Sequence, residues 1–494
     1  MHISFLELFI PIIGILVGWF AVSLGDQPVG LVIWGLYLLL LISVSKPLAQ
    51  WISGEIDAFD PLGLLALFAV HFFGVTPMYQ YASASYPYLQ WDSVTNGWVV
   101  YWFAVNSILM SAFFFVLTKK SSGIVFLSRE RLNCEQPVAT ALYEKAIAYK
   151  IRGVAIFLLV IAVALKALIL AKFGGLGGIM SAYQDRLEQG VTQYNPLAGL
   201  GALVYLSDAA PVLASIVIVL TCVIIKPVRY SAWGGWMLAI GIPVSFLYVG
   251  LVGSRSNTVY TAFILLCYAS MFWRKLRAIN IIIGGVLMVI FMNSYLAYKF
   301  GGIDAVFDEN AKKAAFAARQ LENPLEFLLI RDFGRMDVQV LAMREIFDED
   351  YPPAWGRSYI GGVFSIVPSA IFPGRPENFT LEKTEIVFPG MTLNGEKATT
   401  LVFGGAGEAW VNWKWLAPLV IIPYYFVVVL CVFYFRYGAL GGWNKFLCPV
   451  YSLVPIALLV YDSNSMLYFL AQFALCPLII SLKIKKHPFF CNSW

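Results

Sequence analysis

The chain has 494 residues, of which 60% are hydrophobic and only 13% are charged, and its formal net charge is +5. Soluble domains carry about a quarter charged residues, so this composition excludes an ordinary soluble protein. Apolar windows of about 20 residues recur along most of the length and predict an all-α polytopic membrane protein. The modest positive charge is distributed over loops, and we expect no nucleic-acid partner.

Hydropathy predicts about twelve membrane-spanning helices. The first is expected to span rather than to be a cleavable signal, because the chain lacks a basic start. The spans lie near residues 5–24, 28–45, 61–81, 97–117, 153–172, 205–225, 233–252, 257–272, 279–299, 415–435, 446–461 and 464–482. This divides the chain into N-terminal spans within 1–298, a loop domain at 299–414 and C-terminal spans within 415–494.

The distribution of Lys and Arg predicts the orientation in the membrane. One alternating set of short connections is rich in these residues, and such connections are cytoplasmic in multi-pass proteins. Examples are Lys46, Lys119, Lys120, Arg131, Lys226, Arg229, Arg274, Lys275, Arg436 and Lys483. Both termini are then cytoplasmic, and the long segment 299–414 lies outside the membrane on the opposite face.

The segment 299–414 is the only sizeable polar part of the chain. Its first half, "DENAKKAAFAARQLENPLEFLLIRDFGRMDVQVLAMREIF", has helical spacing, and Pro and Gly interrupt its second half. A segment of this length is usually functional, so we expect a cap over the mouth of the helix bundle. No cysteines have metal-ligand spacing, and we expect no metal site.

One arginine interrupts an apolar stretch, "LYVGLVGSRSNTVYTAFILL". Arg255 is expected at the outer turn between two spans, where a buried guanidinium normally faces a wet cavity or an anion. The next helix begins just after it, and free N–H groups at a helix start also attract phosphate. The alternative is that Arg255 reaches to the membrane surface as a topology anchor.

Further arginines in the outer loops suggest a site for an anion. Arg331 and Arg335 are four positions apart and would share one face of a helix. For each of them alone, a solvated ion-pairing residue is the favoured interpretation. As a group beside the membrane they predict an anion-binding lid. The candidates for pyrophosphate binding are Arg186, Arg255, Arg331, Arg335, Arg357 and Arg375.

Candidate catalytic and sugar-binding residues lie around "FGGAGEAWVNWKW", before a span. Glu408 among aromatic residues would have a raised pKa and can act as a general base. Trp410 is a candidate for stacking on a sugar, as is Tyr183 in another outer loop. Asp208 is a second candidate acid, with a helix N-cap as the simpler interpretation.

Several absences narrow the chemistry. The sequence has no G-x-x-x-x-G-K-[ST] loop and therefore no ATP motor of that type. Histidine occurs at His2, His71 and His487 only, so acid–base chemistry in segment 299–414 must use carboxylates. The spans also lack obvious acid and base pairs, which disfavours a proton-coupled transporter.

Several stretches together resemble the bacterial oligosaccharide repeat-unit polymerases, the O-antigen polymerase (Wzy-like) family. They are "FDPLGLLALFAVHFFGVTPMY", "FGGLGGIMSAYQDR", "GSRSN", "PPAWGRSYIGGVFSIVPSAIFPGRPENF" and "GEAWVNWKWLAPLVI". The resemblance implies a glycosyltransferase of the bacterial inner membrane with a GT-C-like fold and a periplasmic active site. Its substrates would be undecaprenyl-pyrophosphate-linked oligosaccharides, as donor and acceptor. It would need no metal, nucleotide or other cofactor, and a chain-length regulator and a flippase are candidate partners.

The expected chemistry assigns roles to these residues. Arg255 and loop arginines would stabilise the departing pyrophosphate, and Glu408 or Asp337 would deprotonate the acceptor hydroxyl. Two alternatives remain: an O-antigen ligase, which is expected to use a histidine in the large outer loop, and a flippase or exporter of lipid-linked sugars. A regulatory subunit of an export complex has no specific support in the sequence.

Overall fold

A computed structural model of the chain describes most of its helices and the connections between some of them. The described residues are 5–24, 30–83, 93–132, 139–175, 177–178, 201–225, 240–241, 255–272, 275–301, 304–317, 334–348, 351–365, 367, 372, 379, 383, 386, 403–437 and 446–485. The predicted span at 233–252 therefore lies almost entirely outside the described residues.

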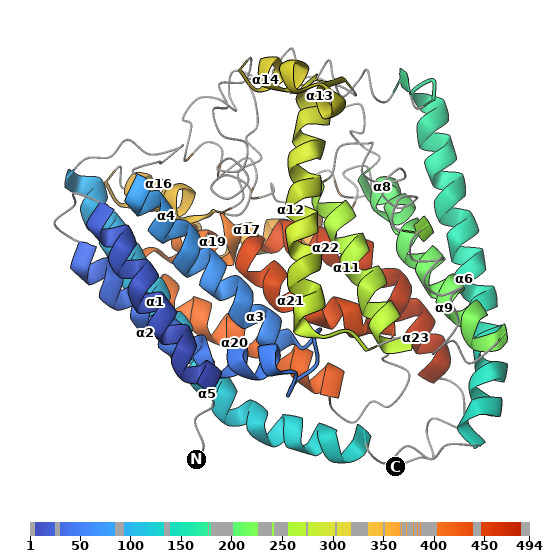
Figure 1. The fold of residues 1–494 in the computed structure, drawn as a ribbon. Helices are drawn as coiled ribbons and strands as arrows, with labels where there is room; N and C mark the ends of the chain where they lie inside the picture. Colours follow the sequence, from blue (N-terminus) through green and yellow to red (C-terminus); the bar gives the residue numbers. More distant parts are fainter. Residues whose placement is uncertain are drawn as a thin grey trace.

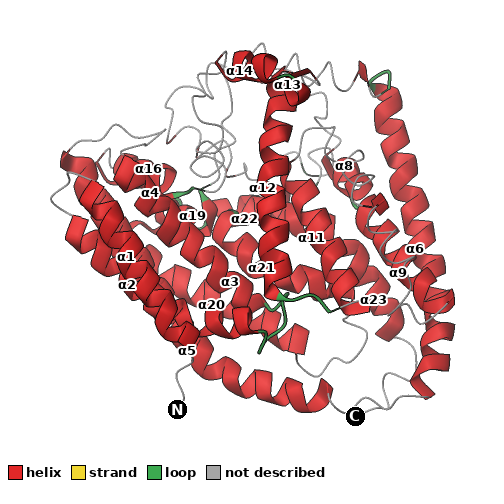
Figure 2. Cartoon of the chain, viewed as in Figure 1, coloured by secondary structure: helices red, strands yellow, loops and turns green. Residues whose placement is uncertain are grey.

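The described part of the chain is helical and contains no strand, as the composition predicts (Figure 2). The first half comprises α1 (Phe5–Leu24), α2 (Gly30–Ser53), α3 (Pro61–Val70), the π-helix η1 (His71–Val75), α4 (Thr76–Ser83), α5 (Ser93–Leu132), α6 (Ala139–Lys172), α8 (Gly201–Asp208) and α9 (Ala210–Ile225). The second half comprises α11 (Arg255–Phe272), α12 (Ala278–Gly301), α13 (Asp304–Phe307), α14 (Glu309–Ala317), α16 (Met336–Asp348), α17 (Arg357–Ser365), α19 (Gly404–Trp413), η5 (Lys414–Leu416), α20 (Ala417–Tyr437), α21 (Cys448–Val460), α22 (Ser463–Phe473) and α23 (Leu475–Lys485).

Several of these helices are suited to a lipid bilayer. Among the described residues, six helices are long and apolar enough to cross a membrane, or seven if the bent pair α22–α23 is one span. Four shorter apolar helices coincide with predicted spans, at Phe5–Trp19, Leu206–Thr221, Asn257–Met271 and Cys448–Val460. The protein is therefore an all-α membrane protein, and the number of twelve spans stays a prediction.

The helix bundle has an upper and a lower side in the view of Figure 1. The long helix α12 carries α13 and α14 at its upper end, and α16 also lies on the upper side. The start of α1 and the end of α23 lie on the lower side. Helix α11 runs down to the connection 275–277, from which α12 rises, so Arg255 begins α11 on the upper side.

Local sequence explains where the helices that surround the site begin. The Asp60 carboxylate accepts from the N–H groups of Leu62 and Gly63 at 2.8 and 3.4 Å, and Pro61 occupies the first turn of α3. The Asp462 carboxylate similarly accepts from the Ser465 N–H at 2.9 Å at the start of α22. These caps fix two helix starts inside the bundle.

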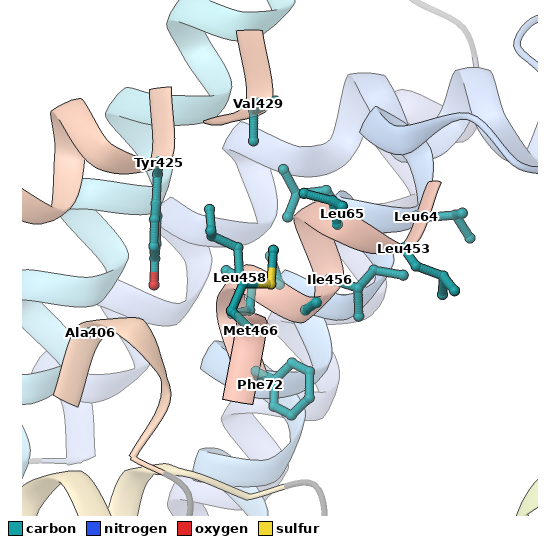
Figure 3. Packing of buried hydrophobic residues seen from close by; sticks show 14 of the residues in the cluster. Leu64, Leu65, Phe72, Ala406, Tyr425, Val429, Leu453, Ile456, Leu458 and Met466 are labelled. Carbon is teal, nitrogen blue, oxygen red and sulfur yellow. The ribbon is translucent and has the colours of Figure 1, made fainter. Parts of the chain in front are cut away.

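The apolar core joins helices from both halves of the chain. Figure 3 shows side chains of α3, η1 and α19–α22 packed around one another: Leu64, Leu65, Phe72, Ala406, Tyr425, Val429, Leu453, Ile456, Leu458 and Met466. Helix α19 is buried along its length and packs on α16, α20 and α21. It ends at Lys414, where φ is 45°, and it belongs to the candidate span Gly404–Arg436, which begins earlier than the predicted span at 415–435.

Candidate functional site

A buried carboxylate ties three helices together. Glu408 of α19 has no exposed surface. Its Oε1 accepts from the Ser358 hydroxyl of α17 at 2.6 Å and from the Ser463 hydroxyl of α22 at 2.7 Å, and its Oε2 accepts from the Ser463 N–H at 2.6 Å. Glu408 therefore holds α17 and α22 against α19.

Asn412 completes this contact one helical turn later. Its Nδ2 donates to the Ser358 hydroxyl at 2.7 Å and to the Glu408 carbonyl at 2.8 Å. Its Oδ1 accepts from the Gly356 N–H at 2.9 Å. Gly362 allows the close approach of α17 to α22, because a Cβ there would lie 2.7 Å from the Ser463 hydroxyl. The polar contact and the glycine together set the position of α17.

A buried ion pair lies beside the Glu408 contact. Lys383 Nζ is 2.8 Å from Asp462 Oδ2, and the two side chains are 3% and 1% exposed. Burial alone would raise the pKa of Asp462, but the Lys383 charge and the hydrogen bonds from Ser465 hold it below its usual value. Asp462 therefore stays ionised while it caps α22.

A second polar centre lies at the start of α16. Arg335 is 8% exposed and its guanidinium carbon lies 6.0 Å from the centroid of the Phe72 ring. Its charge acts on His71, in the π-helix that interrupts the span Pro61–Ser83, and on Tyr260 of α11. A buried guanidinium beside a histidine and a tyrosine is a polar environment inside an apolar bundle, and such environments mark functional sites.

Asp337 adds a carboxyl group to this centre. It is 1% exposed, and its Oδ1 accepts from the Val338 N–H at 2.9 Å. Burial raises the pKa of Asp337 to about 6, against the opposing effects of Val338, the Gln80 side chain and Arg335. Oδ2 has no hydrogen bond of ordinary length from a described residue. Asp337 is thus an acid with spare acceptor capacity and a pKa close to neutrality.

Gln339 links the two polar centres. Its Nε2 donates to the Phe403 carbonyl at 2.6 Å, and its Oε1 accepts from Trp102 Nε1 at 2.7 Å. Gly404, with φ of 70°, permits this contact, because a Cβ there would meet the Leu459 carbonyl at 2.8 Å. The start of α16 is thereby fixed to α5 and α19.

The two predicted bases differ in their hydrogen bonding. Both oxygens of Glu408 accept hydrogen bonds from serines, whereas Oδ2 of Asp337 accepts none from a described residue. Both carboxyl groups are buried.

Three sequence interpretations need correction. Trp410 has no exposed surface, because it packs against Tyr101 and Phe347 with ring centroids 5.7 and 6.4 Å away, so no face of it is open to a sugar. Arg335 is not on an exposed face of a helix: α16 begins at Met336, and Arg335 is buried before it. Asp208 closes α8 rather than capping the next helix.

Asp208 instead forms an ion pair that the sequence analysis missed. Lys166 Nζ of α6 lies 2.8 Å from Asp208 Oδ1, and both residues are buried. Lys166 belongs to the candidate span Tyr149–Lys172, and Asp208 to the apolar helix Leu206–Thr221. The spans therefore do contain an acid–base pair, contrary to expectation.

Several predicted residues fall where the structure says little or nothing. Tyr183, Arg186, Arg331 and Arg375 lie outside the described residues, and of Arg255 only the backbone is described, as the first residue of α11. Arg357 is the exposed first residue of α17. Of the six predicted cations, the structure brings only Arg335 into a described polar centre.

The residues that the sequence analysis missed are His71, Gln80, Ser358 and Ser463. His71 was placed inside its span, and histidine chemistry was excluded for the outer segment. The charge of Arg335, which belongs to that segment, acts on His71, so the exclusion of histidine applies to the residues of the segment itself and not to the surrounding spans. The sequence did contain one indication of a polar centre, since a single apolar span carries a histidine, a threonine and a glutamine.

The comparisons with known proteins add no relative. No protein-family model matches the sequence, and no curated protein or solved structure is similar enough to count as a match. Fold and site together define a class, an all-α membrane protein with ionisable groups buried between its helices. Its particular activity is inferred from the site.

Proposed function

We propose that this protein polymerises undecaprenyl-pyrophosphate-linked oligosaccharide repeat units into a surface polysaccharide. The proposal includes about twelve spans in a GT-C-like arrangement in the bacterial inner membrane, with both termini cytoplasmic and the active site periplasmic. The position of α13 and α14 above the bundle, with α16 on the same upper side, supports a large segment on one face of the membrane (Figure 1).

The observation that carries the proposal is that Arg335 and Asp337, two positions apart, are both buried at the start of α16. In the reaction, an acceptor hydroxyl attacks C1 of the donor sugar while the bond from C1 to the pyrophosphate oxygen breaks. The leaving oxygen takes the bonding electrons, and Arg335 stabilises its negative charge. The hydroxyl proton passes to Asp337, whose pKa of about 6 suits a base at neutral pH.

The remaining residues support this centre in different ways. Arg255 begins an 18-residue helix at the same end of the bundle, where its charge and the free N–H groups favour an anion. Glu408 fixes α17 and α22 against α19, and Gln339 fixes α16 to α19. Both donor and acceptor sites thus rest on rigid helices.

The test is polymer formation by the purified protein in lipid nanodiscs with defined lipid-linked repeat units. Removing one donor to a developing anion typically costs about 100-fold to 1,000-fold in kcat. We expect such a loss for Arg335→Ala and a partial loss for Arg335→Lys, which keeps the charge without the fork of donors. Arg344→Ala is the matched control, because Arg344 lies in α16, which begins directly after Arg335, and its side chain is 34% exposed. Unchanged polymer length with Arg335→Ala would exclude the proposed site.

A flippase or exporter of lipid-linked sugars is the second candidate, and the buried Lys166–Asp208 pair favours it. Cells distinguish the two, because loss of a polymerase leaves single-repeat glycans at the surface, whereas loss of a flippase leaves none. In proteoliposomes, movement of the lipid-linked unit without polymer formation would support the exporter.

The ligase alternative also gains an observation, since the charge of Arg335 acts on a histidine, His71. A ligase transfers a finished glycan once to a different lipid and makes no longer chain. Longer glycans from a single defined lipid-linked repeat would therefore separate polymerisation from ligation.

A further inference from the structure

The turn before α17 holds a tryptophan in an unusual backbone conformation. Trp355 has φ of 48° and is followed by Gly356 with φ of 86°. Among the described residues other than glycine, only Trp355 and Lys414 have positive φ. A bulky side chain in this region is strained, and such residues gather at functional sites when their surroundings enforce them.

The end of α19 enforces this conformation. The N–H groups of Ala354 and Trp355 donate to the carbonyls of Val411 and Asn412, both at 3.1 Å. The Gly356 N–H donates to the Asn412 side chain at 2.9 Å. Carbonyls at the end of a helix lack intrahelical partners, so the turn satisfies groups that would otherwise need water.

These two residues with positive φ, Trp355 and Lys414, are close to one aromatic contact. Lys414 directly follows Trp413, and the Trp413 ring meets the Trp355 ring edge to face, with centroids 5.8 Å apart and planes at 82°. Trp355 is nevertheless 63% exposed. The structure therefore fixes the backbone of Trp355 firmly and leaves most of its ring open.

The surroundings of Trp355 are those of an amphiphile-binding surface. Helix α17 begins two positions later with the exposed cation Arg357, and Ile360, Val363 and Phe364 form an exposed apolar stripe along it. These three features match the three parts of one lipid-linked saccharide. The cation suits the pyrophosphate, the open aromatic ring suits the sugar, and the apolar stripe suits the polyprenyl chain. A rigid tryptophan offers a large contact area at little entropic cost.

We propose that Trp355 stacks on a hexopyranose ring of the lipid-linked saccharide, whose pyrophosphate lies near Arg357 and whose lipid chain follows α17. One face of a pyranose carries C–H groups, which pack against the electron-rich face of an aromatic ring. Trp355 thereby takes the role that the sequence suggested for Trp410. This inference rests on the proposed function, because it assumes a lipid-linked saccharide as substrate.

The test compares lipids with and without a sugar. The protein in nanodiscs is offered an equimolar mixture of undecaprenyl pyrophosphate and the same lipid carrying one hexose (N-acetylglucosamine, N-acetylgalactosamine, galactose or glucose), and native mass spectrometry gives the ratio bound. We expect the wild type to prefer at least one sugar-bearing lipid by about 10-fold, or ~1.4 kcal/mol. Trp355→Ala should reduce that ratio to about 1, whereas Arg357→Ala should weaken the binding of both lipids.

Two further variants control for folding and for general aromatic contacts. Trp355→Gly suits the positive φ, so it should fold at least as well as the wild type and still lose the sugar preference. Trp415→Ala removes a tryptophan that is similarly exposed, at 58%, and should keep the preference.

The outcomes separate this inference from the proposed function. If Trp355→Ala and Trp355→Gly keep the wild-type ratio, or weaken both lipids equally as a membrane anchor would, the sugar-stacking role is wrong and the polymerase proposal stands. Equal wild-type affinity for all lipids also removes the role of Trp355. Failure of the wild type to bind any of the lipids overturns the proposed function and this inference together.

Discussion

Replacement of Asp337 by asparagine separates the energetic role of this carboxyl group from its chemical role. Burial raises its pKa from 3.8 to about 6, so the folded protein favours the neutral acid. The associated stabilisation is complete below about pH 4 and is lost as the pH rises through 6. Two units of pKa correspond to about 3 kcal/mol, which the ionised wild type lacks at pH 7.5.

Asparagine keeps the shape and the acceptor for the Val338 N–H but cannot ionise. We therefore expect Asp337→Asn to be more stable than the wild type at pH 7.5, by up to about 3 kcal/mol, and no more stable at pH 4. Thermal unfolding in detergent between pH 4 and 8 measures the difference. Asp348→Asn, at the exposed end of the same helix with a side chain 42% exposed, is the control and should change little.

Polymer formation should change with pH in the opposite direction to the stability of the wild type. Polymer formation by the wild type should rise with pH through about 6, as Asp337 loses its proton and becomes a base. Asp337→Asn should form little polymer at any pH. If wild type and variant share one pH profile of unfolding, Asp337 does not ionise in this environment; if the variant polymerises normally, another group is the base.

Substitutions at three contacts test the supporting interactions. Gly362→Ala places a Cβ 2.7 Å from a hydroxyl of α22 and should destabilise by about 1–3 kcal/mol in thermal unfolding, whereas Gly285→Ala, with nothing within 4 Å, should not. Glu408→Gln should retain the fold and measurable polymer formation, because an amide can still accept from the N–H of α22 and donate to the hydroxyls. Glu408→Ala leaves those donors without an acceptor and should reduce the amount of folded protein. If both Glu408 variants fold normally and lose turnover equally, Glu408 is the base. Lys166→Met leaves Asp208 buried and unpaired at a cost of about 3–5 kcal/mol, and adding Asp208→Leu should restore stability; no recovery in the double variant would indicate a functional pair.

The sequence alone predicted the positions of many helices, because an apolar window is a property of one continuous stretch of the chain. The span expected at 61–81 is found at Pro61–Ser83, where Asp60 caps the start of the helix and Pro61 occupies its first turn. The π-helix at His71–Val75 was not foreseen, since hydropathy does not distinguish a π-helical turn from the α-helix around it. Hydropathy identifies which segments are buried in lipid or protein but does not distinguish the two.

The sites were less predictable because their partners are distant in the chain. Glu408 was singled out, yet its hydrogen-bond partners Ser358 and Ser463 are 50 and 55 positions away and carry no motif. Spacing of four predicted that Arg335 shares one helix face with Arg331, whereas Arg335 precedes α16 and is buried against Phe72. Periodicity describes one helix at a time, and burial between helices depends on which of them meet.

Irregular backbone provides an independent reason to place function at these two centres. The π-helix interrupts the span that contains His71, and α21 gives way to α22 through the cap residue Asp462, after which α22 and α23 bend by 50°. Within a bilayer, irregular backbone is tolerated only where protein or a water-filled cavity surrounds it. The breaks coincide with the Arg335 centre and the Glu408 contact, while exposed apolar residues such as Ile290 lie on the uninterrupted helix α12. A bundle that needed only to remain in lipid would gain nothing from such interruptions, so their coincidence with buried ionisable groups favours a binding centre over a purely structural polar core.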